Sequence, residues 1–325
     1  MEKQDTESFS RAHELLDRCR SEIGLRVVGQ AGMVDGMLRA LVAGGHALIE
    51  GVPGLAKTLA VKTLAEVLDV EFKRIQFTPD LLPADLIGTM IYRQHSGEFV
   101  ARKGPIFSNI VLADEINRAP AKVQSALLEA MQEHQVTIGE NTFRLGDPFF
   151  VLATQNPIEQ EGTYQLPEAQ LDRFLVKILV TYPDPAEEVE VLKRMGVERE
   201  IPVRKVLSVK ELGVVRGVAE SVRIDDRIAE YIVAIAHASR ERARGKHPFS
   251  RHIEYGVSTR AALALYRCAK VHALFDGRSY VLPDDVKTAA PEVLRHRIIL
   301  SYEAESEELT ADDVVGQILE AVPIP

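Results

Sequence analysis

The segment that most constrains this chain is Gly51-Val-Pro-Gly-Leu-Ala-Lys57-Thr58, which joins a short apolar run to a helical pattern. The run Ala47–Glu50 has the length of a buried strand, so the segment is expected to form a tight turn between a strand and a helix. There, the backbone N–H groups of the turn and of the helix start point to one place and favour an anion. Lys57 can reach the β- and γ-phosphates of a nucleotide, and the Thr58 hydroxyl lies where Mg²⁺ would bind. The segment therefore predicts a phosphate-binding loop.

Alanine stands directly before the lysine, where loops of this kind usually have glycine. Glycine would allow unusual backbone dihedral angles, whereas Ala56 is expected to adopt an ordinary helical or extended conformation, with space left for its methyl group. The alternative interpretation of the segment is a surface turn with a lysine at a helix start, because a match this loose also occurs by chance. Other parts of the sequence are needed to decide between the two.

Length and composition are those of an ordinary globular protein. The 325 residues fit one large or two ordinary domains, and 46% of them are hydrophobic against 27% charged. A net charge of −9 argues against a general nucleic-acid binder. Cys19 and Cys268 have no metal-binding spacing, so buried, reduced thiols are expected. The N-terminus does not resemble a signal peptide and the apolar runs are too short to span a membrane, so we expect a cytoplasmic protein without membrane insertion.

Strands and helices alternate through the first half of the chain. Helical patterns separate the run at residues 47–50 from four further short apolar runs, at residues 72–77, 109–113, 149–153 and 175–180. This alternation predicts an α/β fold with a parallel sheet wrapped by helices. Two segments interrupt it and read as inserted β-hairpins, residues 89–106 turning at His95-Ser96-Gly97 and residues 135–146 turning at Gly139-Glu140-Asn141.

The character of the chain changes at the proline-rich residues 182–185, after which helical patterns dominate. They cover residues 225–242, 259–274 and 283–298. The sequence therefore predicts an α/β domain over residues 1–183, including the N-terminal helices, and an all-helical domain over residues 184–325.

Polar side chains follow two of the predicted strands. Asp114 and Glu115 end one strand, where parallel sheets bind ligands, so Asp114 can hold Mg²⁺ and Glu115 can activate the attacking water. The alternative is that both acids simply begin a helix. Asn156 ends the next strand and can donate to a phosphate or hold the water, unless Asn156-Pro157 is an ordinary turn.

These motifs, in this order, resemble the MoxR family of AAA+ ATPases, relatives of magnesium chelatase. The resemblance rests on the loop at residues 51–58, on Asp114-Glu115-Ile-Asn-Arg-Ala-Pro, on Ala-Thr-Gln-Asn156-Pro and on Pro167-Glu-Ala-Gln-Leu-Asp-Arg173-Phe. It extends from about residue 27 to the C-terminus and includes Val293-Leu-Arg-His-Arg297. The family typically has alanine at the position of Ala56. The resemblance implies an AAA+ P-loop core with two inserted hairpins and an all-helical lid.

The resemblance also implies roles for single residues. Val28, Gly29 and Gln30 are similar to the segment near the adenine, Asn156 to sensor 1, Arg173 to the arginine finger and Arg260 to sensor 2. Motifs and resemblance together give the nucleotide contacts Val28, Gly29, Gly51, Val52, Pro53, Gly54, Leu55, Ala56, Lys57, Thr58 and Leu59, the metal ligands Thr58 and Asp114, and the catalytic residues Lys57, Glu115, Asn156, Arg173 and Arg260.

Each arginine has an alternative role. Arg173 can be a surface residue paired with Asp172 or Glu168, and Arg260 can bond the end of a helix. Arg118 competes with Arg173 for the finger that a neighbouring subunit inserts.

The function implied by the resemblance is Mg²⁺-dependent ATP hydrolysis in a ring, expected to be a hexamer, coupled to chaperone-like remodelling or maturation of a client, including metal insertion. The expected partner is a protein with a von Willebrand factor A domain. A nucleic-acid-dependent motor is an alternative favoured by Arg93, Arg102 and Lys103 on the first hairpin and disfavoured by the net charge. A nucleotide-gated binding module with little turnover is the other alternative.

Overall fold

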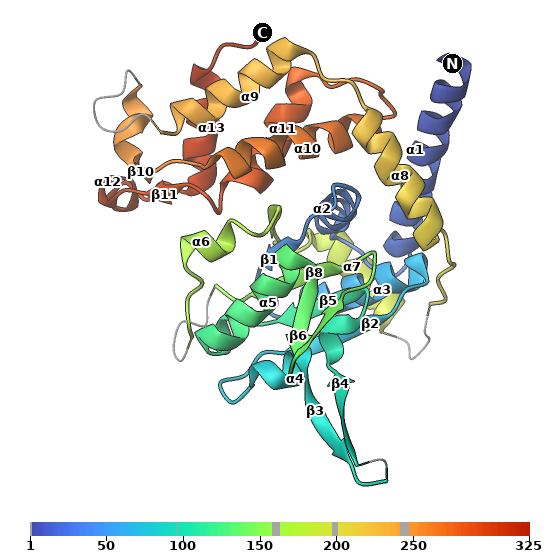
Figure 1. Ribbon diagram of the computed structural model, residues 1–325. Coiled ribbons are helices and arrows are strands. Elements are labelled where there is room, and N and C mark those ends of the chain that lie inside the picture. Colours follow the sequence, from blue (N-terminus) through green and yellow to red (C-terminus); the bar gives the residue numbers. More distant parts are fainter. Residues whose placement is uncertain (1, 96, 158–162, 197–200, 241–246) are drawn as a thin grey trace.

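A parallel five-stranded sheet forms the centre of the N-terminal half, with strand order β2-β5-β8-β1-β9 (Figure 1). The computed structural model describes residues 2–95, 97–157, 163–196, 201–240 and 247–325. The strands are β1 (Ala47–Glu50), β2 (Phe72–Gln76), β5 (Ile110–Asp114), β8 (Phe150–Gln155) and β9 (Val176–Leu179). All four strand pairs are parallel, so the carboxyl ends of the strands lie at one edge of the sheet. The predicted α/β fold is confirmed.

Both faces of the sheet are covered, which explains why its central strands are apolar throughout. Along β5, Ile110 and Leu112 belong to one buried cluster, whereas Val111 and Ala113 belong to another on the opposite face. Helices α2 (Ala31–Val42) and α3 (Lys57–Leu68) contribute to the first cluster, and α5 (Ala121–Glu133) to the second. Strand β2 lies at the edge and is mostly polar, as an edge strand can be.

Both predicted hairpins are present. The first joins β3 (Gly88–Arg93) to β4 (Glu98–Lys103) and extends away from the body of the molecule (Figure 1). Ser96 of its predicted turn lies outside the described residues. The second joins β6 (Gln135–Ile138) to β7 (Asn141–Arg144), so its turn is shorter than predicted and Asn141 already belongs to a strand. The remaining short elements here are α4 (Pro83–Ile87), α6 (Glu168–Leu171) and the 3₁₀ turns η1 (Pro105–Phe107) and η2 (Ile116–Arg118).

Where the structure describes it, the C-terminal half is mainly helical, as predicted, and it also contains a short antiparallel sheet. Its helices are α7 (Pro185–Met195), α8 (Val209–Ser221), α9 (Asp226–Ala238), α10 (Thr259–Phe275), α11 (Pro283–Leu294), α12 (Tyr302–Ser306) and α13 (Ala311–Ala321), with a 3₁₀ turn η3 (Pro248–His252). Strands β10 (Ile253–Tyr255) and β11 (Ile299–Leu300) form the sheet, which was not expected because two or three residues carry no periodic pattern. The predicted end of the α9 pattern, at residue 242, lies outside the described residues.

The N-terminal helix connects the two halves. Helix α1 (Glu2–Gly24) packs against α2 and α3 as well as against α8 and α10 (Figure 1). The domain boundary at residue 183 stays a prediction. Both cysteines are buried and free, as expected. Among the described residues, no helix combines the length and apolarity that a membrane crossing requires.

Candidate functional site

The loop between β1 and α3 needs two of its glycines for different reasons. A Cβ on Gly51 would lie 2.7 Å from the carbonyl oxygen of Val180, so only glycine allows this close approach of two backbone segments. Gly54 adopts a φ of +87°, which side chains rarely tolerate, although nothing lies near its missing Cβ. The glycines therefore fix the shape of the loop directly before the helix.

Ala56 does not have the ordinary conformation expected from its residue type. Its φ and ψ angles are 56° and 18°, in the left-handed region, and it is the N-cap of α3. That expectation was wrong because the turn from the loop into the helix requires a left-handed residue here. Among residues that have a Cβ, alanine has the smallest side chain. It can therefore adopt the left-handed backbone conformation at a modest cost in energy.

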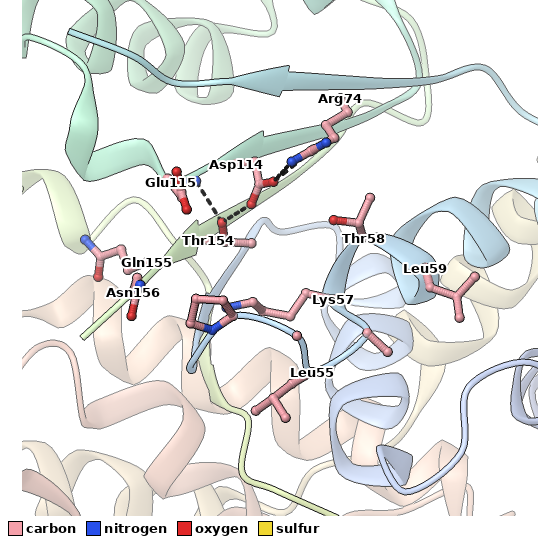
Figure 2. Close-up of a pocket in the computed structure, with 13 residues that line it drawn as sticks. Leu55, Lys57, Thr58, Leu59, Arg74, Asp114, Glu115, Thr154, Gln155 and Asn156 are labelled. Atoms are coloured by element: carbon pink, nitrogen blue, oxygen red, sulfur yellow. Dashed lines mark hydrogen bonds and ion pairs between the residues drawn. The ribbon is translucent and has the colours of Figure 1, made fainter. Parts of the chain in front are cut away.

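A pocket of about 390 Å³ lies over this loop and the ends of β5 and β8 (Figure 2). Its volume suits a small-molecule ligand. Of the predicted site residues, it brings together Pro53, Gly54, Leu55, Ala56, Lys57, Thr58, Leu59, Asp114, Glu115 and Asn156, and it adds Arg74, Thr154 and Gln155. Gly51 and Val52 lie in the same loop without lining the pocket.

Asp114 is held by two neighbours from adjacent strands. Its Oδ2 accepts hydrogen bonds from Nε and Nη2 of Arg74 at 2.9 and 2.6 Å, and its Oδ1 accepts one from the Thr154 hydroxyl at 2.6 Å (Figure 2). Arg74 is half exposed, so this ion pair is only partly shielded from solvent. The carboxylate is thereby fixed at the edge of the pocket while keeping one replaceable, exposed partner.

Glu115 is held in an unusual backbone conformation by the same threonine. Its φ is 56°, and its N–H donates to the Thr154 hydroxyl at 2.8 Å. Its Oε2 accepts a hydrogen bond from Nε2 of Gln76 at 2.7 Å and pairs with Nε of Arg118 at 3.2 Å. A strained residue in a pocket indicates a functional constraint, and no side-chain cap was found at this helix start, which disfavours a simple capping role.

Lys57 and Thr58 point into the same pocket from the start of α3 (Figure 2). Burial lowers the pKa of Lys57, while the charges of Asp114 and Glu115 act in the opposite direction. Its Nζ donates to the carbonyl of Gly51. The Thr58 hydroxyl makes no hydrogen bond within the described part of the chain. Oxygen donors such as this hydroxyl and the Asp114 carboxylate fit a hard divalent cation. No group of three or more metal-binding side chains exists among the residues that the structure describes.

Sequence reasoning did not single out Arg74, Gln76 or Thr154. The first two alternate along the edge strand β2 and therefore share a face, and Thr154 lies beside Asp114 on the neighbouring strand. The sequence signal for these residues was weak: Arg74 and Gln76 are polar and two positions apart in a short strand, which places both on one face of the sheet.

Comparison with known proteins identifies the family. Residues 46–176 match the family described as "ATPase family associated with various cellular activities (AAA)", and residues 249–318 match the AAA lid domain. The chain is 48% identical to Chaperone MoxR1 of Mycobacterium tuberculosis over 95% of its own length and 82% of that protein. The chain belongs to the MoxR family of AAA ATPases. This membership implies that it binds and hydrolyses ATP.

Further relatives agree with the MoxR assignment. A crystal structure of a protein from Cytophaga hutchinsonii superposes with a TM-score of 0.92 at 50% identity, covering 99% of this chain and 98% of that chain. A magnesium-chelatase subunit ChlI homolog of Methanocaldococcus jannaschii is more distant, with 29% identity over 58% of this chain and 50% of that protein. The AAA core and the helical lid are therefore both present.

The two arginines singled out in the MoxR-type motifs lie away from the pocket. Arg173 is half-buried and has no ion-pair partner in the described part of the chain, so its predicted pairing with Asp172 or Glu168 is absent there. Arg260, at the start of α10, instead contacts Asp172, with Nη1 3.5 Å from Oδ2. Neither side chain lines the pocket of its own subunit.

The segment predicted to pack near the adenine lies against the chain that leaves β9. The Gln30 side chain donates to the Thr181 carbonyl at 3.0 Å, and Gly29, with a φ of +70°, lies close to Pro183. Val28 is half-buried beside them. These residues do not line the pocket, so their contact with adenine stays a prediction.

Proposed function

We propose that this MoxR-family ATPase hydrolyses ATP with Mg²⁺ at an interface between subunits of a ring, expected to be a hexamer, and uses the cycle to remodel a client protein. The observation that carries the proposal is the pocket in which Lys57 from the start of α3, Asp114 and Glu115 from the end of β5, and Asn156 from the end of β8 converge. A lysine, two carboxylates and an amide around one loop are what positioning and electrostatic stabilisation of a transferred phosphoryl group require.

Within this pocket we assign Lys57 to the β- and γ-phosphates, and Thr58 and Asp114 to the Mg²⁺ site. The ion would neutralise charge on the phosphates. Because Arg74 and Thr154 already bind Asp114, the carboxylate is proposed to act through water or after Arg74 has moved. Thr154 keeps both acids in fixed positions throughout.

Glu115 is the proposed general base for the attacking water, and Asn156 the residue that holds this water or a phosphate oxygen. One hydrogen bond from Gln76 and the ion pair with Arg118 hold the carboxylate of Glu115 at the pocket wall. Its carboxylate remains partly exposed, with 24% of the side chain accessible, which a group that contacts a water requires.

Arg173 is the proposed finger that acts in a neighbouring subunit. It lies outside its own pocket, is partly exposed and has no counter-ion among the described residues, whereas the competing Arg118 already pairs with Glu115 of its own subunit. A side chain that serves a second site must be presented in this way, and the ring supplies that site. Arg260 is proposed to sense nucleotide from the lid.

The client is inferred from the family. A relative bears the name Chaperone MoxR1, which supports a chaperone-like function. Maturation by metal insertion and a partner with a von Willebrand factor A domain are proposed from the resemblance to the family alone. The β3–β4 hairpin offers a contact surface, because the rings of Tyr92 and Phe99 lie in a tilted contact with centroids 5.2 Å apart and are 55% and 67% exposed. Lys103 of this hairpin lies over the rings of Phe107 and Phe143, so it is less available to a nucleic-acid phosphate.

The decisive experiment is the substitution Glu115→Gln. We expect ATP turnover to fall by about 10²–10⁴-fold, as for loss of a general base, with ATP affinity retained. Glu129→Gln, an exposed acid on α5, is the matched control and should leave turnover unchanged. Unchanged turnover in Glu115→Gln would refute the role of Glu115 as general base.

The proposed partner is tested by incubating the Glu115→Gln protein with candidate von Willebrand factor A domain proteins, with and without ATP. Equal binding in the two conditions would count against a client that the ATP cycle remodels.

A further inference from the structure

The turn after α11 binds the segment that carries Arg173. Three consecutive side chains, Arg295, His296 and Arg297, here called the lid clamp, all contact backbone carbonyls between residues 172 and 177. Arg295 donates to the Lys177 carbonyl at 3.0 Å, and Nε2 of the buried His296 lies 3.1 Å from the Phe174 carbonyl. The clamp belongs to the lid, whereas residues 172–177 belong to the core.

Arg297 is the centre of this contact, because every N–H group of its guanidinium donates a hydrogen bond. Its Nε donates to the Asp172 carboxylate at 2.7 Å. Its two Nη atoms donate to four carbonyls, those of Asp172, Leu175, Phe174 and Val293. A guanidinium has five N–H donors, and here each has an acceptor. The side chain is 3% exposed, so its burial is compensated by this complete set of bonds.

The clamped segment holds Arg173 from both sides. Asp172 before it is bound by Arg297, and Phe174 after it has its carbonyl bound by the clamp and its fully buried side chain in the core. Arg173 itself stays partly exposed. Its backbone is therefore fixed, while its side chain remains available.

Arg260 contacts the same carboxylate but much more weakly. Its Nη1 lies 3.5 Å from Asp172 and its side chain is 51% exposed, against 2.7 Å and 3% for Arg297. An exposed pair at this distance contributes little, whereas releasing a buried arginine that makes five hydrogen bonds, two of them to Asp172, is strongly unfavourable. Arg297 is thus the lasting partner of Asp172, and Arg260 can leave it.

We propose that Arg297, acting through Asp172, is a positioning residue for Arg173. The lid of one subunit thereby fixes the arginine that enters the nucleotide site of its neighbour. This inference rests on the proposed role of Arg173 in a neighbouring subunit. An error of about 1 Å in the placement of such a group can cost 10²-fold in rate, so a loosened clamp is expected to be visible in turnover.

The test uses two inactive subunits that complement each other. A donor carries Glu115→Gln and an intact Arg173, and an acceptor carries Arg173→Ala and an intact Glu115. Their mixture turns over ATP only where a donor arginine enters an acceptor site. Arg297→Lys is then placed in the donor or in the acceptor, since lysine keeps the charge but has three donors without the planar fork.

We expect Arg297→Lys in the donor to lower the restored turnover at least tenfold and the same change in the acceptor to lower it less than twofold. Arg267→Lys is the matched control, because it makes the same change at an exposed arginine of the lid helix α10, outside the lid clamp. It should have little effect in either subunit. Amide hydrogen exchange at residues 173 and 174 should accelerate in Arg297→Lys, with α3 unchanged.

The outcomes separate this inference from the proposed function. If Arg297→Lys lowers the restored turnover equally in donor and acceptor, or in neither, the positioning role of Arg297 is refuted while the proposed role of Arg173 stands. No turnover from the intact mixture would refute the action of Arg173 in a neighbouring subunit, and this inference with it. If Arg297→Lys does not fold, Asp172→Asn takes its place, because it keeps the side-chain shape and removes the charge that Arg297 binds. The same asymmetry is expected.

Discussion

The left-handed conformation of Ala56 predicts that glycine at this position of the loop between β1 and α3 stabilises the protein. A non-glycine residue in this region costs about 1–2 kcal/mol. Glycine removes this cost but gives the unfolded chain more freedom, which costs about 0.4–1 kcal/mol. The difference gives an expected stabilisation of about 0–1.6 kcal/mol for Ala56→Gly, from these two terms.

Two further variants bracket this prediction. Ala56→Val places a β-branched side chain at a φ of 56°, which should destabilise the protein by about 1–3 kcal/mol. Ala60→Gly is the matched control, because Ala60 lies fully buried one turn into α3 with ordinary helical geometry. There glycine is expected to cost about 1 kcal/mol from helix propensity, in addition to the loss of a buried methyl group.

The assay is guanidinium-induced unfolding followed by circular dichroism, since the chain has no tryptophan to report by fluorescence. The midpoint should rise or stay level for Ala56→Gly and fall for Ala56→Val and Ala60→Gly, with an unchanged dependence on denaturant. Equal destabilisation by Ala56→Gly and Ala60→Gly would refute the left-handed assignment.

Three further predictions follow from buried polar groups. Thr154→Val removes the hydroxyl that joins the two acids at the end of β5 and should lower ATP turnover by about 10- to 100-fold. Arg278→Met leaves the carboxylate of Asp285, which is 3% exposed, without its two hydrogen bonds from a cation, and should cost about 3 kcal/mol of unfolding free energy. Burial lowers the pKa of His46 from 6.5 to about 4, so the unfolded chain binds a proton first as the pH falls. Stability should then decrease between pH 6.5 and 4, by about 1.4 kcal/mol per pH unit from this residue.

Each of these has a control and a contradicting result. Thr154→Ser keeps the hydroxyl and should retain most activity, and an equal loss in both variants would point to packing instead. Adding Asp285→Asn to Arg278→Met should recover part of the stability, and an unaffected single variant would contradict the buried ion pair. His46→Gln should flatten the acid slope measured by unfolding at each pH, and an identical slope would eliminate His46 as its cause.

The sequence predicted the main strands and helices well because burial produces regular patterns. Apolar runs of strand length correspond to β1, β5, β8 and β9. Segments whose apolar residues recur every 3.6 positions correspond to α3 and α5. Parallel strands place their carboxyl ends at one edge, so the sequence alone predicts Asp114 and Asn156 beside Lys57. The short sheet β10–β11 could not be predicted, since its pairing joins two segments without a periodic pattern.

Local sequence thus determined the turn between β1 and α3, the acids at the strand ends and the family, because each depends on neighbouring residues or on strand order. Tertiary structure alone decided the left-handed Ala56, the partners of Asp114 and Glu115, and the lid clamp. Arg297 and Asp172 are 125 residues apart, and their contact depends on how the lid folds back on the core. The residue type alone does not predict such a partner, because an arginine binds any acceptor that the packing of distant segments brings within reach.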